Sequence, residues 1–424
     1  MTTNLQLLYT IRRRSYGSSS TPRLPNEVQL LDAIALYLVN NTPGDVVAVS
    51  LDATPGGLQL VLARNDVTLT SKDTDTARDF FATVVSLQKP LDLLRFPLDH
   101  SLGFLKAKMR KVAAIDMGIV DKFLDMYAFA SFATEFKKIA GLAEKLKRRW
   151  DLSDPHQLVR HTFIEMIATA TDLSRTDALI DHKAFVKFLI YPVFLSYCGF
   201  YSLRSCQSDR TSRDMMEKYK RRIAKLERYH EGAYLIHEAR LHHWPQNTVI
   251  PHIWISGPSI LDIDVGPSPL AAASNIFPTI TEDKLVRANP TIIQHWKSNV
   301  QSFIHPELRL ILHLDMQTPS LRSRFLLDQT QMRCIGLSRQ SCQCCAKWID
   351  RWNDRRSTQW ITSGQNGMGF RTWKLTGYSE LADHVVIGYV KRELTTDMGS
   401  AGGHWEPDGN SVSSLWAALS EVED

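Results

Sequence analysis

The residues of this chain whose types and spacing could support chemistry are His305, Glu307, Cys342 and Cys345. His305 and Glu307 form a His-x-Glu triplet, and the cysteines form a Cys-x-x-Cys pair that begins 37 residues after the histidine. One imidazole and two thiolates hold zinc and leave the fourth tetrahedral position to water, as in catalytic zinc sites. We therefore expect His305, Cys342 and Cys345 to bind Zn²⁺.

Glu307 has the position of a proton carrier in such a site, because it lies two residues from a ligand. Hydrolytic removal of an exocyclic amine from a nucleobase requires water, activated by zinc, to attack a carbon of the aromatic ring. A carboxylate must then move a proton to the ring nitrogen and assist the departure of ammonia. The pattern predicts a zinc-dependent deaminase whose substrate is a nucleoside, a nucleotide or a base in single-stranded nucleic acid.

Two helices and a strand must position these four residues. Pro306 suits the first position of a helix, and the run from Leu308 to Leu314 is apolar nearly all round, which predicts a buried helix. Residues 331–338 predict a short core strand. Cys342 then opens a second helix, whose apolar face continues through Cys345. A strand, a turn with ligands and a helix are the setting that this motif requires.

The spacing of the cysteines selects among the neighbouring thiols. Cys342 and Cys345 are about 60° apart around a helix, so both can face one metal ion. Cys344 is about 200° from Cys342 and should point elsewhere. We expect Cys344 and Cys334 to be core or spare thiols.

Two other functions fit the same residues. The chain could be a catalytically inactive interaction protein that retains structural zinc and binds a protein partner through its helical N-terminal region. The Cys342–Cys345 pair could also act in thiol redox chemistry, although the chain lacks the βαβ setting of an exposed redox pair.

Flipped bases are usually held by aromatic and amide side chains. Trp360, Asn366, Phe370 and Trp373 follow the cysteines in the sequence. Each of the four could lie on the rim of the substrate pocket or belong to the core.

Composition limits the class of protein. The chain has 424 residues, of which 44% are hydrophobic and 22% charged, as in globular proteins of two or three domains. No apolar run reaches the ~18 residues that span a bilayer, so we expect no membrane segment. Four of the six cysteines lie within residues 334–345, which favours metal chemistry in a reducing compartment over a disulfide framework. The protein is therefore expected inside the cell, in the cytoplasm or the nucleus.

The chain divides into four predicted regions. Residues 1–25 contain no Asp or Glu and predict a flexible basic tail, with a mitochondrial import signal as the alternative. Residues 26–245 predict a mostly helical region with one β-hairpin around Pro55-Gly56-Gly57. The zinc domain is expected in residues 246–398, and residues 399–424 predict a flexible acidic tail.

Basic segments occur on three of the predicted helices, in residues 106–111, 145–149 and 218–228. These segments could contact phosphates, but solvated helix faces are the more common origin of such runs. The net charge of +5 permits a nucleic-acid partner and does not indicate one. A further helix is expected from Asn289-Pro290 through Val300, with Ile292, Ile293, Trp296 and Val300 on one face.

The motifs resemble those of the OTT-like deaminases of fungi, within the superfamily of zinc-dependent nucleotide and nucleic-acid deaminases. That family shows His-Ala-Glu before an apolar run, a strand Ile-Gly-x-Ser-Lys, and Cys-x-x-Cys. The corresponding segments here are residues 305–312, 334–339 and 341–345. The resemblance implies an α/β fold: a C-terminal three-layer α/β/α cytidine-deaminase-like domain with a mixed sheet, after a mostly α-helical N-terminal region. It places the zinc site at helix N-termini.

Three positions depart from the family pattern. Ser341 stands where many deaminases have proline, and Pro306 replaces the commoner alanine. Asn366 stands where a histidine is expected after the next strand. The zinc ligands are unaffected by these changes, whereas Asn366 bears on the substrate pocket.

Overall fold

The computed structural model of this chain describes residues 26–40, 45–54, 57–65, 69–127, 129, 132–176, 179–198, 210–242, 244, 250–257, 261–274, 280–288, 292–317, 331–354, 358–364 and 373–400. The predicted basic tail, residues 1–25, lies outside these ranges. Of the predicted acidic tail, residues 399 and 400 are described, and they belong to a helix.

A five-stranded mixed sheet with the order β3-β2-β1-β6-β7 lies at the centre of the fold. Its strands are β1 (Val47–Thr54), β2 (Gly57–Arg64), β3 (His252–Trp254), β6 (Gln331–Leu337) and β7 (Thr358–Thr362). β1 runs antiparallel to both β2 and β6, whereas β2–β3 and β6–β7 are parallel pairs. The predicted hairpin is confirmed as β1–β2, and the strand predicted before the cysteines is confirmed as β6.

The β1–β6 pair joins segments that are nearly 300 residues apart in the sequence. Ala48 pairs with Leu337 and Ser50 with Ile335. Side chains add to the ladder at both ends, because Ser338 Oγ accepts from Val47 N at 2.9 Å and Ser50 Oγ donates to the Cys334 carbonyl at 2.9 Å. The sheet therefore draws strands from both sides of residue 245.

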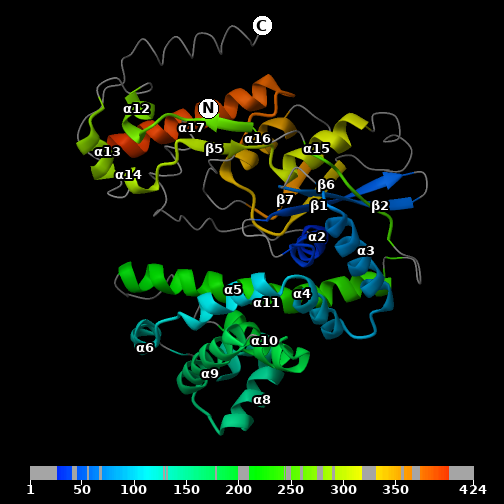
Figure 1. Ribbon diagram of the computed structural model, residues 1–424. Helices are drawn as coiled ribbons and strands as arrows, with labels where there is room; N and C mark the ends of the chain where they lie inside the picture. The colour runs from blue at the N-terminus through cyan, green and yellow to red at the C-terminus, as the bar shows by residue number, and fades with distance from the viewer. Residues whose placement is uncertain are drawn as a thin grey trace.

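Side chains on alternate strand positions enter two separate cores. Leu60 and Leu62 of β2 face the first core, and Val61 and Ala63 face the second. Helix α2 (Asn26–Tyr37) covers the first face, where it packs on β6 and β1. The second face is covered by α15 (Pro306–Gln317) and α16 (Gln343–Asn353), and α17 (Glu380–Ser400) packs on α16 in the same core. Figure 1 shows the sheet between α15 and α16 on one side and α2 on the other.

The segment between β2 and β3 is helical and extends the first core, as predicted for the N-terminal region. Its longest helix is α11 (Arg210–His242), which packs against α2, α5, α6 and α10 (Figure 1). The others are α3 (Ser71–Ser86), η2 (Pro90–Leu94), α4 (Arg95–His100), α5 (Leu102–Ala113), α6 (Met117–Met126), α7 (Phe132–Glu135), η3 (Lys137–Ile139), α8 (Ala140–Trp150), α9 (Pro155–Arg175) and α10 (His182–Tyr197). None of the helices in the described ranges is long and apolar enough to cross a membrane.

The helix predicted from residue 289 through Val300 is wrong in its second half. Short helices α12 (Pro269–Ser274), α13 (Glu282–Ala288) and α14 (Ile292–His295) lie between β4 (Leu261–Asp264) and β5 (Asn299–Ser302), which pair as a two-stranded sheet. Val300 and Ser302 of β5 are buried while their neighbours are exposed, so the pattern has the period of a strand. Strand pairing, with Val300 opposite Ile263, outweighs the helical spacing of the apolar residues.

Gly336 of β6 permits the close packing of α2 on the sheet. A Cβ atom at this position would lie 2.0 Å from the carbonyl carbon of Leu31 and 2.3 Å from the backbone nitrogen of Asp32. These contacts are with backbone atoms, which cannot rotate away as a side chain can. Only glycine therefore allows α2 and β6 to approach as they do.

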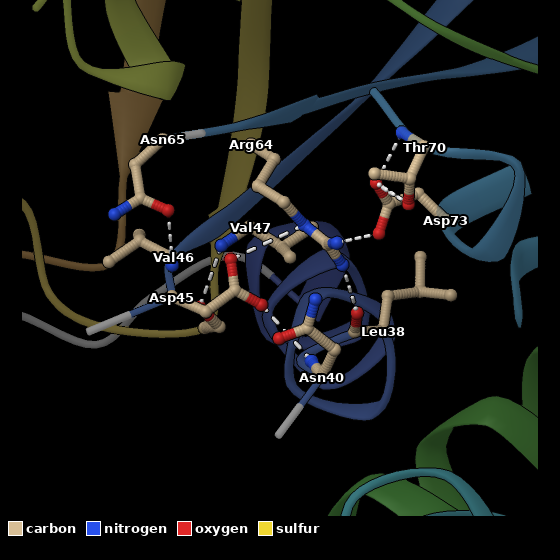
Figure 2. Close-up of polar contacts among 10 residues, drawn as sticks. Leu38, Asn40, Asp45, Val46, Val47, Arg64, Asn65, Thr70 and Asp73 are labelled. Atoms are coloured by element: carbon tan, nitrogen blue, oxygen red, sulfur yellow. Dashed lines mark hydrogen bonds and ion pairs between the residues drawn. The ribbon is translucent and has the colours of Figure 1, made fainter. Parts of the chain in front are cut away.

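A buried cation, Arg64, ties the end of β2 to its neighbours in the first core. Its Nη1 donates to Asp73 of α3, its Nη2 donates to the Leu38 carbonyl at 3.0 Å, and its Nε lies 3.3 Å from Asp45 Oδ1. The two carboxylates also accept hydrogen bonds from the backbone, Asp73 from Thr70 N at 2.9 Å and Asp45 from Asn40 N at 3.0 Å (Figure 2). The cluster connects α2, the hairpin and α3 around the guanidinium group of Arg64.

Replacement of Arg64 by methionine should lower the free energy of unfolding by about 3–5 kcal/mol, because two buried carboxylates lose their partner. Arg78→Met is the matched control, since Arg78 pairs with Asp75 at 2.9 Å but is exposed, and such pairs contribute less than about 1 kcal/mol. Urea unfolding measures both variants. Equal losses would contradict a special role for Arg64.

Gly336→Ala should lower the free energy of unfolding by about 1–3 kcal/mol, because the new methyl group overlaps the backbone of α2. Gly388→Ala in α17 has open space around the new Cβ and should be neutral or stabilising by up to about 1 kcal/mol. Thermal or urea unfolding compares the two. An unchanged midpoint for Gly336→Ala would show that α2 does not pack on β6 in this way.

Candidate metal centre

His305 and Cys342 occupy the beginnings of two helices whose N-termini meet. The His305 carbonyl accepts the first hydrogen bonds of α15, from Leu308 N and Arg309 N at 3.1 Å each. Cys342 is the N-cap of α16, with an extended backbone, and its Sγ accepts from Cys345 N at 3.4 Å. The partial positive charge of a helix N-terminus favours anionic ligands such as a thiolate. The fold therefore directs two helix termini at one point.

Three ligand atoms converge at that point. His305 Nδ1 lies 3.6 Å from Cys342 Sγ and 3.4 Å from Cys345 Sγ, and all three atoms lie within 4.8 Å of one another. A tetrahedral zinc with ordinary Zn–S and Zn–N bonds separates sulfur and nitrogen by about 3.5 Å. Within the described ranges, this is the one group of His, Cys, Asp or Glu residues that meets the geometry of a metal site. The buried His-Cys-Cys triad can hold a metal ion.

The three ligand groups have shifted pKa values, because they are buried and face one another. Burial raises the pKa of Cys342, but hydrogen bonds from Cys344 and Cys345 and the charge of His305 outweigh it and bring the pKa well below the usual value. Burial lowers the pKa of His305, and the Cys342 thiolate opposes this and raises it. Burial, aided by Cys342 and Glu307, raises the pKa of Cys345. Metal binding must therefore displace protons from His305 and Cys345.

Glu307 lies beside the triad on the first turn of α15 and is buried. Its Oε1 accepts a hydrogen bond from Ser341 Oγ at 2.9 Å, and its charge contributes to the raised pKa of Cys345. Ser341 immediately precedes Cys342, so one short segment supplies a ligand and a partner of the carboxylate. In the family pattern, Ser341 is only a departure from proline. Its adjacency to Cys342 was the available signal for this role.

Trp373 is a residue of the site that motif spacing did not identify as such. Its indole Nε1 donates to Cys345 Sγ at 3.2 Å, a contact that orients the sulfur. Its backbone is held beside the strand that leads to His305, because the Trp373 carbonyl accepts from Ser302 Oγ at 3.2 Å and Lys374 N donates to the Phe303 carbonyl at 3.1 Å. The segment around residue 373 thus supports both halves of the triad.

The four pocket candidates downstream of the cysteines have different outcomes. Trp360 and Trp373 are buried in the second core, and Trp360 Nε1 donates to Asp315 at 3.2 Å. Both tryptophans are therefore core residues. The sequence had left two positions open for them, the rim of the pocket and the core. Asn366 and Phe370 lie outside the described residues.

Cys344 and Cys334 are buried thiols, as expected, and neither belongs to the triad. The angular argument for Cys344 needs one correction. Cys342 is the extended N-cap residue and does not follow helical rotation, so the Cys344 thiol is near enough to the Cys342 sulfur to lower the pKa of Cys342. Cys344 therefore contacts a ligand without being one.

Comparisons of this chain with protein-family models, with curated proteins and with solved structures find no match.

Cys345→Ala should abolish stoichiometric metal binding, whereas Cys344→Ala should retain about one metal ion per chain, because only Cys345 joins the triad. Inductively coupled plasma mass spectrometry on protein purified without chelator measures both. Loss of metal in Cys344→Ala, with Cys345→Ala still loaded, would reverse the assignment of the two thiols.

Proposed function

We propose that this protein is a zinc-dependent hydrolytic deaminase that acts on a nucleobase. The observation that carries the proposal is the convergence of His305, Cys342 and Cys345 at two helix N-termini, with the Glu307 carboxylate beside them. Three ligands that leave one tetrahedral position open are typical of catalytic zinc and differ from the four ligands of structural sites. A neighbouring carboxylate that is not a ligand is the other requirement of this chemistry.

The order of elements supports the same proposal. The chain begins the fold with helix α2 and the hairpin β1–β2, and the helices of residues 71–242 come next. Later in the chain follow α15 with His-x-Glu, then β6, then α16 with Cys-x-x-Cys, and then β7. Helices cover both faces of the mixed sheet that these strands form. This arrangement fits the three-layer α/β/α cytidine-deaminase-like fold that the resemblance to OTT-like deaminases implies. In that interpretation the helices of residues 71–242 are an insertion between β2 and the zinc-binding elements.

The side chains divide the work as follows. His305, Cys342 and Cys345 would hold zinc, which when bound lowers the pKa of water and supplies a nucleophile at neutral pH. Glu307 would take one proton from the attacking water and deliver it to the ring nitrogen. It would then carry the proton of the new hydroxyl group to the exocyclic amine, which leaves as ammonia. The hydrogen bond from Ser341 orients the carboxylate for both transfers. Burial of Glu307 excludes bulk water, which would compete for these protons.

A redox role for the cysteine pair has less support. Cys342 and Cys345 are 1% and 0% exposed, so neither sulfur is accessible to a second thiol or disulfide. Reactive redox cysteines are partially exposed, because exchange requires direct attack on sulfur. An inactive interaction protein with structural zinc remains the alternative, and it differs from the enzyme in needing no carboxylate at position 307.

The proposal predicts different effects for a ligand and for the proton carrier. Wild type and Glu307→Ala should each contain about one zinc ion, whereas His305→Ala should contain none. Deamination of cytosine- or adenine-containing substrates should fall about 10²- to 10⁴-fold or more in Glu307→Ala, because proton transfer is lost while the metal is kept. Mass spectrometry measures the zinc, and ammonia release measures the activity.

Different negative results in these measurements would contradict different parts of the proposal. Well-folded wild type without zinc would overturn the metal site and the deaminase together. Zinc in wild type and in Glu307→Ala, with no ammonia from either base in nucleosides, nucleotides or single strands, would leave the inactive interaction protein. Equal activity of wild type and Glu307→Ala would contradict the role of the carboxylate.

A further inference from the structure

Basic residues from three distant parts of the sequence meet on one surface of the fold. We call them the cationic cluster, and its members are Lys108, Lys111, Arg221, Lys225, Arg228 and Arg339. They come from α5, from α11 and from the turn after β6. Two of the basic segments in the sequence, residues 106–111 and 218–228, are therefore not independent solvated faces.

Specific contacts fix these elements against one another. Arg228 Nη2 donates to the Leu337 carbonyl at the end of β6 at 3.3 Å, which joins α11 to the sheet. Arg222 Nη1 donates to the Lys111 carbonyl at 2.8 Å, which joins α11 to α5. Lys108 Nζ donates to Tyr229 Oη at 3.2 Å. The positions of the cations thus follow from the packing of helices and sheet.

The cations act on one another electrostatically. Burial lowers the pKa of Lys108, and the charges of Arg228, Lys225, Arg339 and Lys111 lower it further. Desolvation by the elements packed around it, and neighbouring cations, likewise lower the pKa of Lys225, whose side chain is exposed at its end of the cluster. Repulsion of this kind requires separations within about a Debye length of 8–10 Å. The cluster is a concentrated positive surface, and a bound polyanion would reduce the repulsion between its cations.

Carboxylates offset only part of this charge. Asp32 lies 3.8 Å from Arg228, and Asp45, which attracts Arg339, also pairs with the buried Arg64. Lys111, Lys225 and Arg339 are exposed to solvent. Among the described residues, no carboxylate forms an ion pair with any of these three side chains. Three accessible cations are thus available to a ligand.

We propose that the cationic cluster binds the phosphodiester backbone of a single-stranded nucleic acid. Arg221, Lys225 and Arg228 follow one face of α11 at helical spacing and extend over about 10 Å. A strand carries one phosphate per about 3.4 Å in a helix and fewer when extended, so this stripe matches two or three phosphates. A row of cations at such spacing fits a repeating anion better than a single phosphate.

The cluster lies close to the metal centre along the chain. Arg339 precedes the ligand Cys342 by three residues, so their Cα atoms are at most about 11 Å apart. A strand held at Arg339 could therefore present a base to the triad. This second step rests on the proposed deaminase function, whereas binding of the strand does not.

The test is fluorescence anisotropy with a labelled 12-nucleotide single-stranded DNA and the zinc-loaded full chain of Glu307→Ala, which prevents turnover. The double variant Lys225→Ala, Arg339→Ala, made in the same background, should bind at least about tenfold more weakly. The slope of log K against log salt should become shallower by about 1.4, since each lost phosphate contact contributes about 0.7. Lys72→Ala, Lys145→Ala removes the same charge from exposed sites on α3 and α8 and should change binding less than about twofold.

Three results would overturn the inference: equal weakening in the control pair, equal affinity for a methylphosphonate strand without backbone charge, or competition by inorganic triphosphate at the same phosphate concentration. The last would assign the cluster to a small phosphate ligand. Strand binding that depends on Lys225 and Arg339, without any deamination by wild type, would support this inference and count against the proposed function. Deamination of a free nucleoside without strand binding would do the reverse.

Discussion

The antiparallel pairing of β1 with β6 is the interaction on which the rest of the structure depends. It brings the hairpin from the first part of the chain against the strand that leads to Cys342. Because β6 is thereby held between β1 and β7, its end has a defined position, and α16 can begin there with a thiolate at its N-cap. The same pairing places Gly336 under α2, which closes the first core. Together with the packing of α2 on β6 and the bond from Arg228 to Leu337, it fixes the helices of residues 71–242 relative to the triad.

Two buried polar clusters flank this sheet, and the buried charges are compensated in a different way in each. Around Arg64, one cation is paired with two carboxylates that the backbone also binds, so the charges are satisfied within the protein. Around His305, mutual contacts lower the pKa of Cys342 and raise those of His305 and Cys345, and a metal ion would satisfy the three groups together, because it can replace protons. The first cluster is therefore suited to stability and the second to binding.

Local patterns predicted much of the site. The His-x-Glu and Cys-x-x-Cys spacings indicated the triad, the apolar run from Leu308 indicated a buried helix, and residues 331–338 indicated a core strand. Ser341 and Trp373 were not recognised as partners of Glu307 and Cys345, because each contact joins residues 28 or more positions apart. The helix expected through Val300 failed for a related reason, since the pairing with Ile263 competes with local helical spacing.

The sequence by itself determined which residues could bind a metal and which elements carry them, because ligand type, helix caps and hydrophobic periodicity act over a few residues. Only the tertiary structure decided that the hairpin joins the strand of the cysteines and that Cys344 contacts Cys342. It also decided that the basic residues of α5, α11 and the turn at Arg339 form one surface. These outcomes depend on contacts between segments up to nearly 300 residues apart, which are set by the packing of two cores on one sheet and leave no local pattern.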